Sequence, residues 1–267
     1  MVEERTLTRR ELNRALLERQ LLLARSSLPV ARAVGRLGGL QAQSTPSPYL
    51  SLWTRLDGFE RDGLTRALQA RRVVKALLQR GTLHVVVPRH YWAHTAVRRP
   101  PASALWPTAY EVRSSSAEIR HLAKELLREL ERRELTLTEA QELLAPHARE
   151  SVPPTFPWRR LQSYAPIVHV APSGIWGYGG HGVYAAAAGR LRGEEPAFED
   201  GLDVLVTTYL RAYGPASAQD FGRWAGIPRL GPIREALGRL SLRTFREERG
   251  STPTARGSSA TSRRAGS

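Results

Sequence analysis

Apolar residues recur three and four positions apart in several stretches of the chain, which is the spacing of a helix with one buried face. Three of these stretches follow a hydroxyl residue that stands three positions before an acid or an amide. This arrangement is typical of a capping box, in which both side chains bond free backbone N–H groups at a helix start. The predicted starts are Thr8–Glu11, Thr138–Gln141 and Ser217–Asp220.

The same spacing predicts helices over residues 117–133, 202–213, 217–225 and 232–240. Gly214 and Pro215 separate the second of these helices from the third, and Gly226 ends the third. A helix, a tight turn, a short helix, a second turn and a further helix form the helix-turn-helix layout. The region after residue 200 is therefore predicted to contain such a motif.

Short apolar runs bounded by glycine or proline predict β-strands at residues 82–87, 167–171, 175–178 and 183–184. Two runs joined by a glycine-containing turn favour a β-hairpin. Helices followed by a hairpin make a winged helix. The sequence therefore predicts a mainly α fold with short β-hairpins (α+β), built from tandem winged-helix or helix-turn-helix units.

The repeated layout divides the chain into four parts. Residues 1–104 form a less regular winged-helix-like unit, residues 105–200 a second winged helix, and residues 201–249 an incomplete third. Residues 250–267 form a basic tail without a large apolar residue, so we expect it to be disordered. Because apolar periodicity stops near Arg243, the third unit looks shortened at its C-terminal end.

Positive charge is concentrated at the two ends of the chain. The formal net charge is +15, from 40 Lys and Arg residues against 25 Asp and Glu residues. Residues 1–100 carry +11, residues 101–200 carry −2 and residues 201–267 carry +6. Such a distribution favours a nucleic acid partner, and the alternative is a surface that arginine merely keeps soluble. With no long apolar run and no secretory signal, we expect a cytoplasmic protein without a membrane segment.

Residue types narrow the possible chemistry. Cysteine is absent, which excludes disulfides and thiolate sites. His90 and His94 stand four apart, but no paired acid follows them, so they match a helical zinc signature poorly. The serines lack a nucleophile-elbow setting. We therefore expect neither a metal nor a cofactor.

Gln41 and Gln43 remain as candidates for chemistry. A primary amide is not a strong base at neutral pH, but it donates and accepts hydrogen bonds at once. Amides two positions apart share one side of an extended chain and diverge on a helix. Gly38 and Gly39 favour a helix end before them. On residue types alone the pair either holds a water molecule beside a nucleotide or simply bonds neighbouring loop backbone.

A resemblance separates these alternatives. The stretch "LGGLQAQSTPSPYLSLWTRL", with "LTRRELNRALLERQ" before it and "LLQRGTLHVVVPRHYW" after it, resembles the AlkZ-like bacterial DNA glycosylases, a winged-helix family that includes a YcaQ-like branch. The later block "VLVTTYLRAYGPASAQDFGRWAGI" is similar to the helix-turn-helix of the same family. The resemblance covers about residues 6–240, and Gln41-Ala42-Gln43 matches the glutamine–apolar–glutamine signature of the AlkZ-like branch.

The resemblance implies tandem winged helices around a basic face that binds double-stranded DNA. It also implies hydrolysis of the N-glycosidic bond of N7-alkylated purines, in some members at interstrand crosslinks, with Gln41 and Gln43 as the catalytic pair. A purine alkylated at N7 is cationic and leaves readily, so oriented amide dipoles and a positioned water suffice. We expect Gln43 to orient the water and Gln41 to contact the sugar or the base.

Further DNA contacts are expected around this pair and in the last motif. The block "RGTLH" resembles the family, and it makes Arg80 a phosphate contact and His84 a pocket residue or a bonded core histidine. The arginines of the last motif suit phosphates or a solvated face equally. The predicted DNA-binding residues are Arg80, Thr82, His84, Arg223, Arg229 and Arg234.

Two smaller expectations complete the sequence-based picture. Tyr49 and Trp53 stand four apart on a predicted helix, where we expect them to pack against each other. The protein is expected to act as a monomer. The rival hypotheses are a winged-helix transcription regulator without catalysis and an inactive, truncated homologue.

Overall fold

The computed structural model describes residues 5–98, 116–147, 158, 161–162 and 164–247, and the predicted tail at 250–267 lies outside these ranges. Its helical elements are α1 (Arg9–Arg19), α2 (Val30–Arg36), α3 (Pro46–Trp53), α4 (Arg61–Gln69), η1 (Gln79–Gly81), α5 (Pro88–Arg98), α6 (Ser116–Arg132), α7 (Leu137–Leu144), η3 (Ala145–His147), α9 (Phe198–Tyr213), α10 (Ala218–Ala225) and α11 (Leu230–Arg239). Its strands are β1 (Thr6–Leu7), β2 (Leu40–Gln41), β3 (Val74–Leu77), β4 (Leu83–Val86), β5 (Leu135–Thr136), β6 (Ile167–His169), β7 (Val183–Ala186) and β8 (Arg246–Glu247).

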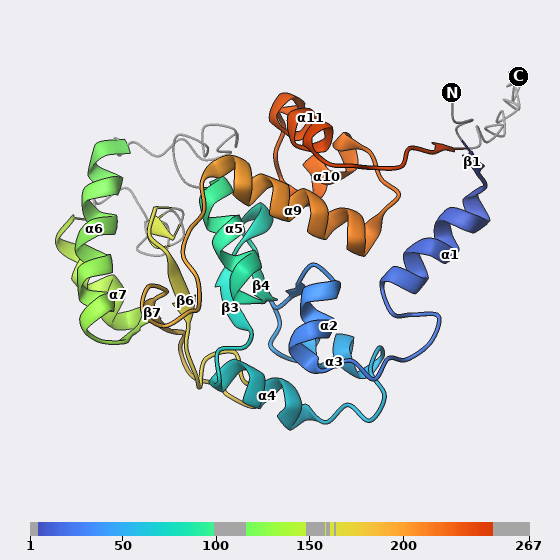
Figure 1. The fold of residues 1–267 in the computed structure, drawn as a ribbon. Coiled ribbons are helices and arrows are strands. Elements are labelled where there is room, and N and C mark those ends of the chain that lie inside the picture. The colour runs from blue at the N-terminus through green and yellow to red at the C-terminus, as the bar shows by residue number, and fades with distance from the viewer. Residues whose placement is uncertain (1–4, 99–115, 148–157, 159–160, 163, 248–267) are drawn as a thin grey trace, which may run out of the picture.

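A six-stranded antiparallel sheet forms the centre of the molecule. The strands follow the order β2-β4-β3-β6-β7-β5, and Lys75 of β3 lies opposite His169 of β6. This pairing joins strands that the sequence assigned to the first and the second winged-helix unit. In Figure 1, α6 and α7 lie at the β5 end of the sheet, while α2 and α3 lie towards the β2 end.

Apolar side chains from both faces of the sheet build the core. Leu40 and Val85 pack with residues of α2, α3 and α4, whereas Val86 packs with Tyr91 and Trp92 of α5. Alternate residues of a strand point to opposite faces, so β4 contributes to both clusters. Helix α5 also packs against α9, and the two helices share a hydrophobic cluster with α10 and α11, which joins the helix-turn-helix to the sheet.

The predicted fold class is confirmed: the structure combines helices with short antiparallel strands in winged-helix units. The helix start at Ser217 is also confirmed. The Ser217 hydroxyl accepts a hydrogen bond from Asp220 N–H, and the Asp220 carboxylate accepts one from Ser217 N–H. Helix α10 ends at Gly226, whose φ of 75° suits glycine. The predicted boundaries at residues 104, 200 and 249 stay predictions.

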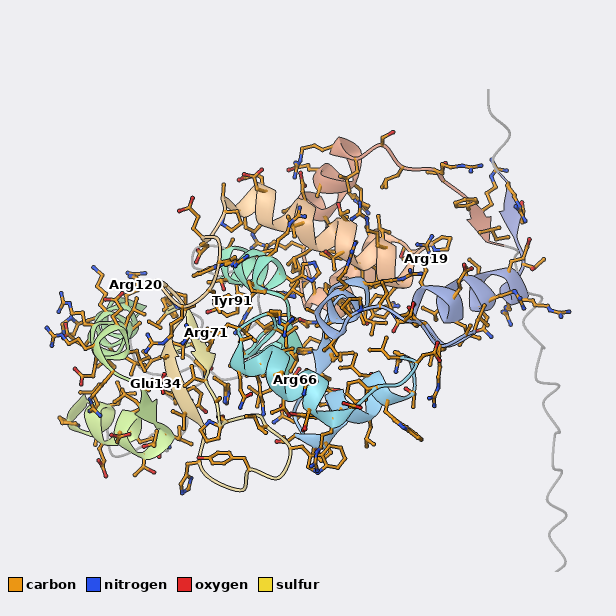
Figure 2. All side chains as sticks on the ribbon, turned by 60° about the horizontal axis from the view of Figure 1, so that its bottom comes forward. Arg19, Arg66, Arg71, Tyr91, Arg120 and Glu134 are labelled. Atoms are coloured by element: carbon orange, nitrogen blue, oxygen red, sulfur yellow. The ribbon has the colours of Figure 1, made fainter. Side chains whose placement is uncertain are left out.

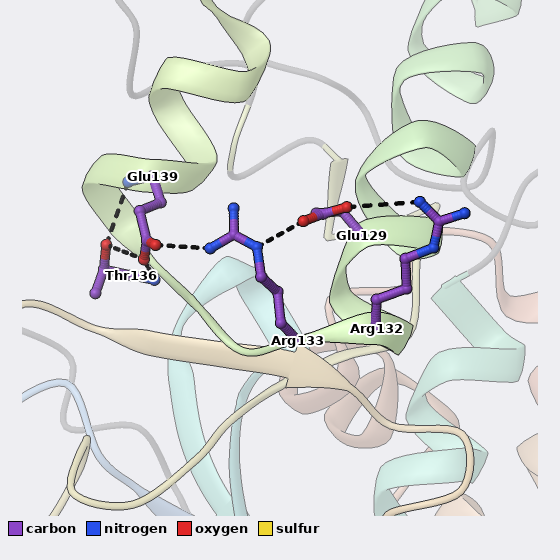
Figure 3. A network of polar contacts seen from close by, with 5 residues as sticks. All are labelled: Glu129, Arg132, Arg133, Thr136 and Glu139. Atoms are coloured by element: carbon purple, nitrogen blue, oxygen red, sulfur yellow. Dashed lines mark hydrogen bonds and ion pairs between the residues drawn. The ribbon is translucent and has the colours of Figure 1, made fainter.

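The helix start predicted at Thr138 is wrong by two residues. Thr136 is the cap, and its side chain and backbone exchange hydrogen bonds with Glu139. Figure 3 shows why this choice is favoured: Arg133 reaches Glu139 at 2.7 Å and Glu129 at 2.6 Å, so the capping acid also connects α6 with α7.

The strand predicted at residues 175–178 is a turn instead. Gly174 and Gly177 both have φ angles of 89°, which bend the chain away from a strand, and β6 pairs with β7. Trp176 lies edge-on against Tyr49 with ring centroids 5.5 Å apart. The expected Tyr49–Trp53 pair is therefore wrong: Tyr49 is buried, whereas Trp53 is 55% exposed and lies under Arg25.

Within the described ranges, no helix is long and apolar enough to cross a membrane.

Candidate active site

Two glycines lead the chain from α2 into the edge strand of the sheet. Gly38 and Gly39 have φ angles of 75° and 106°, which side chains rarely adopt. A Cβ on Gly39 would lie 2.7 Å from a methyl group of Val86. This close contact between Gly39 and Val86 fixes the position of β2, which begins directly after the glycines.

The Gln-Ala-Gln segment continues this edge strand in an alternating pattern. Ala42 is buried, whereas Gln41 and Gln43 are exposed, so both amides leave the extended chain on the same side. Ala42 N–H donates to Leu83 O at 2.7 Å. Leu83 N–H donates to the side-chain oxygen of Gln43 at 3.3 Å. The backbone of β4 therefore holds the Gln43 amide, whose oxygen keeps a second lone pair for another donor.

His84 lies opposite Gln41 in the register of β2 and β4. Its side chain is buried, and Nδ1 donates to Thr82 O at 3.0 Å. Burial is the main cause that lowers the pKa of His84 to about 4, and the positive charges of Arg80 and Arg98 contribute to the same shift. The imidazole is consequently neutral at physiological pH.

Arg80 and Thr82 form the turn that precedes β4. Arg80 has a positive φ of 53° and is exposed, and its NH1 atom donates to Trp224 O at 2.9 Å. Thr82 donates its hydroxyl to Gln79 O at 3.2 Å. The Arg80–Trp224 bond joins η1 to α10. It brings the helix-turn-helix next to the turn that leads into the strand beside the glutamines.

The three arginines predicted in the helix-turn-helix are all exposed. Arg223 lies on α10 with its guanidinium 3.8 Å from Asp220, Arg229 precedes α11, and Arg234 lies on that helix. Arg223 is on α10, the element that contacts η1 through Trp224. The structure thus gathers the predicted residues along one path, from β2 through β4 and η1 to α10 and α11.

The sequence matches the model of the family described as "DNA glycosylase AlkZ-like" over residues 34–266. The chain belongs to this family. It is 25% identical over 231 residues to an "Interstrand DNA cross-link repair glycosylase" of Streptomyces sahachiroi, a match that covers 79% of this chain and 58% of the relative. The chain thus spans less than two thirds of that relative's length.

A solved structure shows the same fold. The DNA glycosylase AlkZ of Streptomyces sahachiroi superposes with a TM-score of 0.72 at 21% identity, covering 88% of this chain and 66% of the other. The family resemblance that the motifs carried is confirmed by these matches.

A cluster of buried polar side chains on α5, beneath β4, was not predicted from the sequence. His90 and His94 of α5 are both buried, and His90 Nε2 pairs with Thr208 Oγ1 at 3.1 Å. Burial is the main cause that lowers the pKa of His90 to about 4 and the pKa of His94 well below 6.5. Within the described part of the chain, the buried atoms without a hydrogen-bond partner are Gln79 Oε1, His90 Nδ1 and His94 Nε2.

The four-residue spacing of His90 and His94 is the only signal of this cluster in the sequence, and it matches a helical zinc signature poorly. Among the residues that the structure describes, no group of three His, Asp or Glu side chains is placed to hold a metal ion. The His90 ring instead bonds Thr208 of α9, and the centroid of the His94 ring lies 5.8 Å from that of the Trp224 ring of α10.

Arginines cover much of the outer surface. Figure 2 labels Arg19 on α1, Arg66 on α4, Arg71 in the turn after α4 and Arg120 on α6, so positive charge is spread across the molecule. A cavity of about 110 Å³ is lined by residues of α4, β3 and β6, and Arg71, Arg190, Glu134 and His169 are among its lining residues. None of the predicted site residues lines that cavity.

Proposed function

We propose that this protein is a monofunctional DNA glycosylase that hydrolyses the N-glycosidic bond of cationic, N7-alkylated purines. Membership of the AlkZ-like family supports the reaction class. The observation that carries the proposal is the pair of exposed amides on one side of an edge strand, with Gln43 held by Leu83 N–H. A merely structural pair would direct both amides to neighbouring backbone, whereas among the described residues only the Gln43 amide of this pair bonds backbone.

The proposed mechanism needs no strong acid. The purine carries its positive charge before the reaction, so the electrons of the C1′–N9 bond neutralise it as the base leaves. The sugar becomes oxocarbenium-like in the transition state. Gln43 Oε1 accepts a hydrogen bond from the attacking water, and the carbonyl dipole of Gln41 faces the developing cation. The water oxygen bonds to C1′, and its proton passes to solvent.

The hydrogen bond from Leu83 orients the Gln43 amide before DNA binds, and this orientation makes Gln43 effective in catalysis. An amide fixed by a backbone N–H does not reorganise during the reaction, and this preorganisation is the main advantage of dipoles in a protein over dipoles in water. The bond to Leu83 uses one of two lone pairs on Gln43 Oε1 and leaves the other for the water.

DNA binding is proposed for the elements next to Gln41 and Gln43. Arg80 and Thr82 lie on the turn before β4, and the exposed Arg223, Arg229 and Arg234 extend the positive surface along α10 and α11. Each arginine neutralises a phosphate and releases counterions, so affinity falls as salt rises. The protein is proposed to act on duplex DNA as a monomer.

Crosslinks are a second substrate in this proposal. The curated relative is named an interstrand DNA cross-link repair glycosylase. An interstrand crosslink formed through purine N7 contains the same cationic base, so breaking one glycosidic bond unhooks it by the same chemistry. A duplex with such a crosslink separates into single strands on a denaturing gel only after one of these glycosidic bonds is cleaved.

Release of free base from a duplex containing N7-methylguanine tests the activity. We expect Gln43→Ala to slow single-turnover release about 10²- to 10³-fold, the loss typical of one preorganised group, with duplex binding retained. Gln69→Ala is the matched control, because Gln69 is an exposed glutamine on α4. Tight binding of undamaged, sequence-selected DNA without release would instead identify a regulator, and neither activity would identify an inactive homologue.

A further inference from the structure

The side chain of His84 lies next to Gln41 on one face of the sheet. The two residues are directly opposite each other in the antiparallel register of β2 and β4. The neighbouring pair, Ala42 and Leu83, is joined by a backbone hydrogen bond. Gln41 and His84 therefore form a non-hydrogen-bonded pair, the kind in which facing side chains approach most closely.

The imidazole of His84 has a defined hydrogen-bonding pattern. Thr82 O is a carbonyl and can only accept, so the proton of the neutral ring lies on Nδ1. The Nε2 atom then carries a bare lone pair, and no described residue donates a hydrogen bond to it. Burial, and then the positive charges of Arg80 and Arg98, disfavour a second proton on the ring. His84 is thus a fixed hydrogen-bond acceptor behind Gln41.

Gln41 needs such an acceptor because its amide has two ends of similar shape and opposite polarity. Only the oxygen end stabilises a developing cation, and the NH₂ end would repel it. The exposed amide can turn freely in water. When DNA covers the strand and excludes water, the end that faces the sugar is decided by the nearest protein group.

We propose that His84 is a positioning residue for Gln41: in the DNA complex, Nε2 of His84 accepts a hydrogen bond from the Gln41 amide nitrogen, so that Gln41 Oε1 faces the reacting sugar. This inference rests on the proposed glycosylase function. Gln43 has a different anchor, the backbone N–H of Leu83. His84 therefore acts on one member of the pair, and this selectivity distinguishes positioning from general support of the fold.

Two substitutions separate the two nitrogen atoms of the ring. His84→Asn can still donate to Thr82 O but has no acceptor at the place of Nε2, whereas His84→Gln is long enough to restore a carbonyl acceptor there. We expect His84→Asn to slow single-turnover release of N7-methylguanine about 10- to 100-fold, the range for a misplaced catalytic group. His84→Gln recovers most of the rate.

A double-mutant cycle completes the test. If His84 acts through Gln41, His84→Asn adds no further slowing in a Gln41→Ala background but keeps its full effect in a Gln43→Ala background. Equal slowing in both backgrounds, or no rescue by His84→Gln in folded protein, overturns the inference while the glycosylase function stands. Absence of base release by the unaltered protein overturns the proposed function and this inference with it. Thermal melting of each variant identifies any that fails to fold.

Discussion

The two ends of the six-stranded sheet use polar side chains in opposite ways. At the β5 end, Arg133, Glu129 and Glu139 lie near the surface and satisfy one another, as Figure 3 shows. At the β2 end, His90 and His94 are buried and each has a ring nitrogen without a partner among the described residues. At the β5 end the polar groups form solvent-exposed ion pairs. At the β2 end neutral imidazoles are buried beneath the candidate active site.

This difference indicates where function constrains the sequence. A buried polar atom without a hydrogen bond destabilises the fold, typically by about 1–3 kcal/mol. Apolar side chains could fill the space beneath β4 more favourably. Polar groups that persist in such a position, next to an exposed amide pair, favour a functional origin. The exposed network at the β5 end needs no such explanation, because surface ion pairs contribute little either way.

Lowering the pH is expected to give the largest difference between the two ends. The folded pKa values of His84 and His90 are near 4, below the ordinary 6.5. Between pH 6.5 and 4 the unfolded chain binds protons that the folded chain excludes, so stability falls as pH falls through this window. Each imidazole accounts for about 3 kcal/mol. Urea unfolding at pH 7 and pH 4.5 measures the combined loss.

The β5 end responds in a lower window. Hydrogen bonds from Thr136 are the main cause that lowers the pKa of Glu139 to about 2. Its contribution is present above pH 4.5 and is lost as pH falls towards 2. For the window between pH 6.5 and pH 4, the control substitution is His181→Gln, because His181 is exposed. Equal unfolding free energies at pH 7 and pH 5 would contradict the buried, neutral state of the imidazoles.

Gly39→Ala tests how tightly the β2 end is held. The added Cβ meets a Val86 methyl at 2.7 Å, and the φ of 106° strains any L side chain. We expect a loss of about 3 kcal/mol in urea unfolding, and slower base release because β2 moves. Gly81→Ala is the matched control. Its φ is also positive, at 68°, but a Cβ there meets no described atom within 4 Å, so about 1 kcal/mol is expected.

Features with a local cause could be predicted from the sequence. Ser217, Asp220 and Gly226 specify the start and end of α10 within ten residues. The alternation of Gln41 and Gln43 about a buried alanine follows from an extended chain once the preceding helix ends. These features depend on neighbours in the chain, which the sequence displays directly.

Features with a distant cause could not be predicted. The run at residues 175–178 has strand-like composition, yet Trp176 packs on Tyr49, more than a hundred residues away. The pairing of β3 with β6 and the hydrogen bond between His90 and Thr208 likewise join distant segments. A single sequence contains no signal for such contacts, so the buried polar cluster behind the glutamines became visible only in three dimensions.

The smallest expected effect concerns the cap at the β5 end, where two threonines compete for one role. Thr136 and Thr138 each stand three residues before an acid or an amide, but only Thr136 makes the capping box. Thr136→Ala should therefore lower the unfolding free energy by about 1 kcal/mol, whereas Thr138→Ala, at an exposed position, should change it by less than about 0.5 kcal/mol. Thr136→Ser keeps the hydroxyl and should restore most of the loss. Base release should be unaffected by all three, because the cap is separated from β2 by the width of the sheet. A loss of activity in Thr136→Ala at a temperature where the protein is folded would show that the two ends are coupled, and the contrast between them would then have to be abandoned.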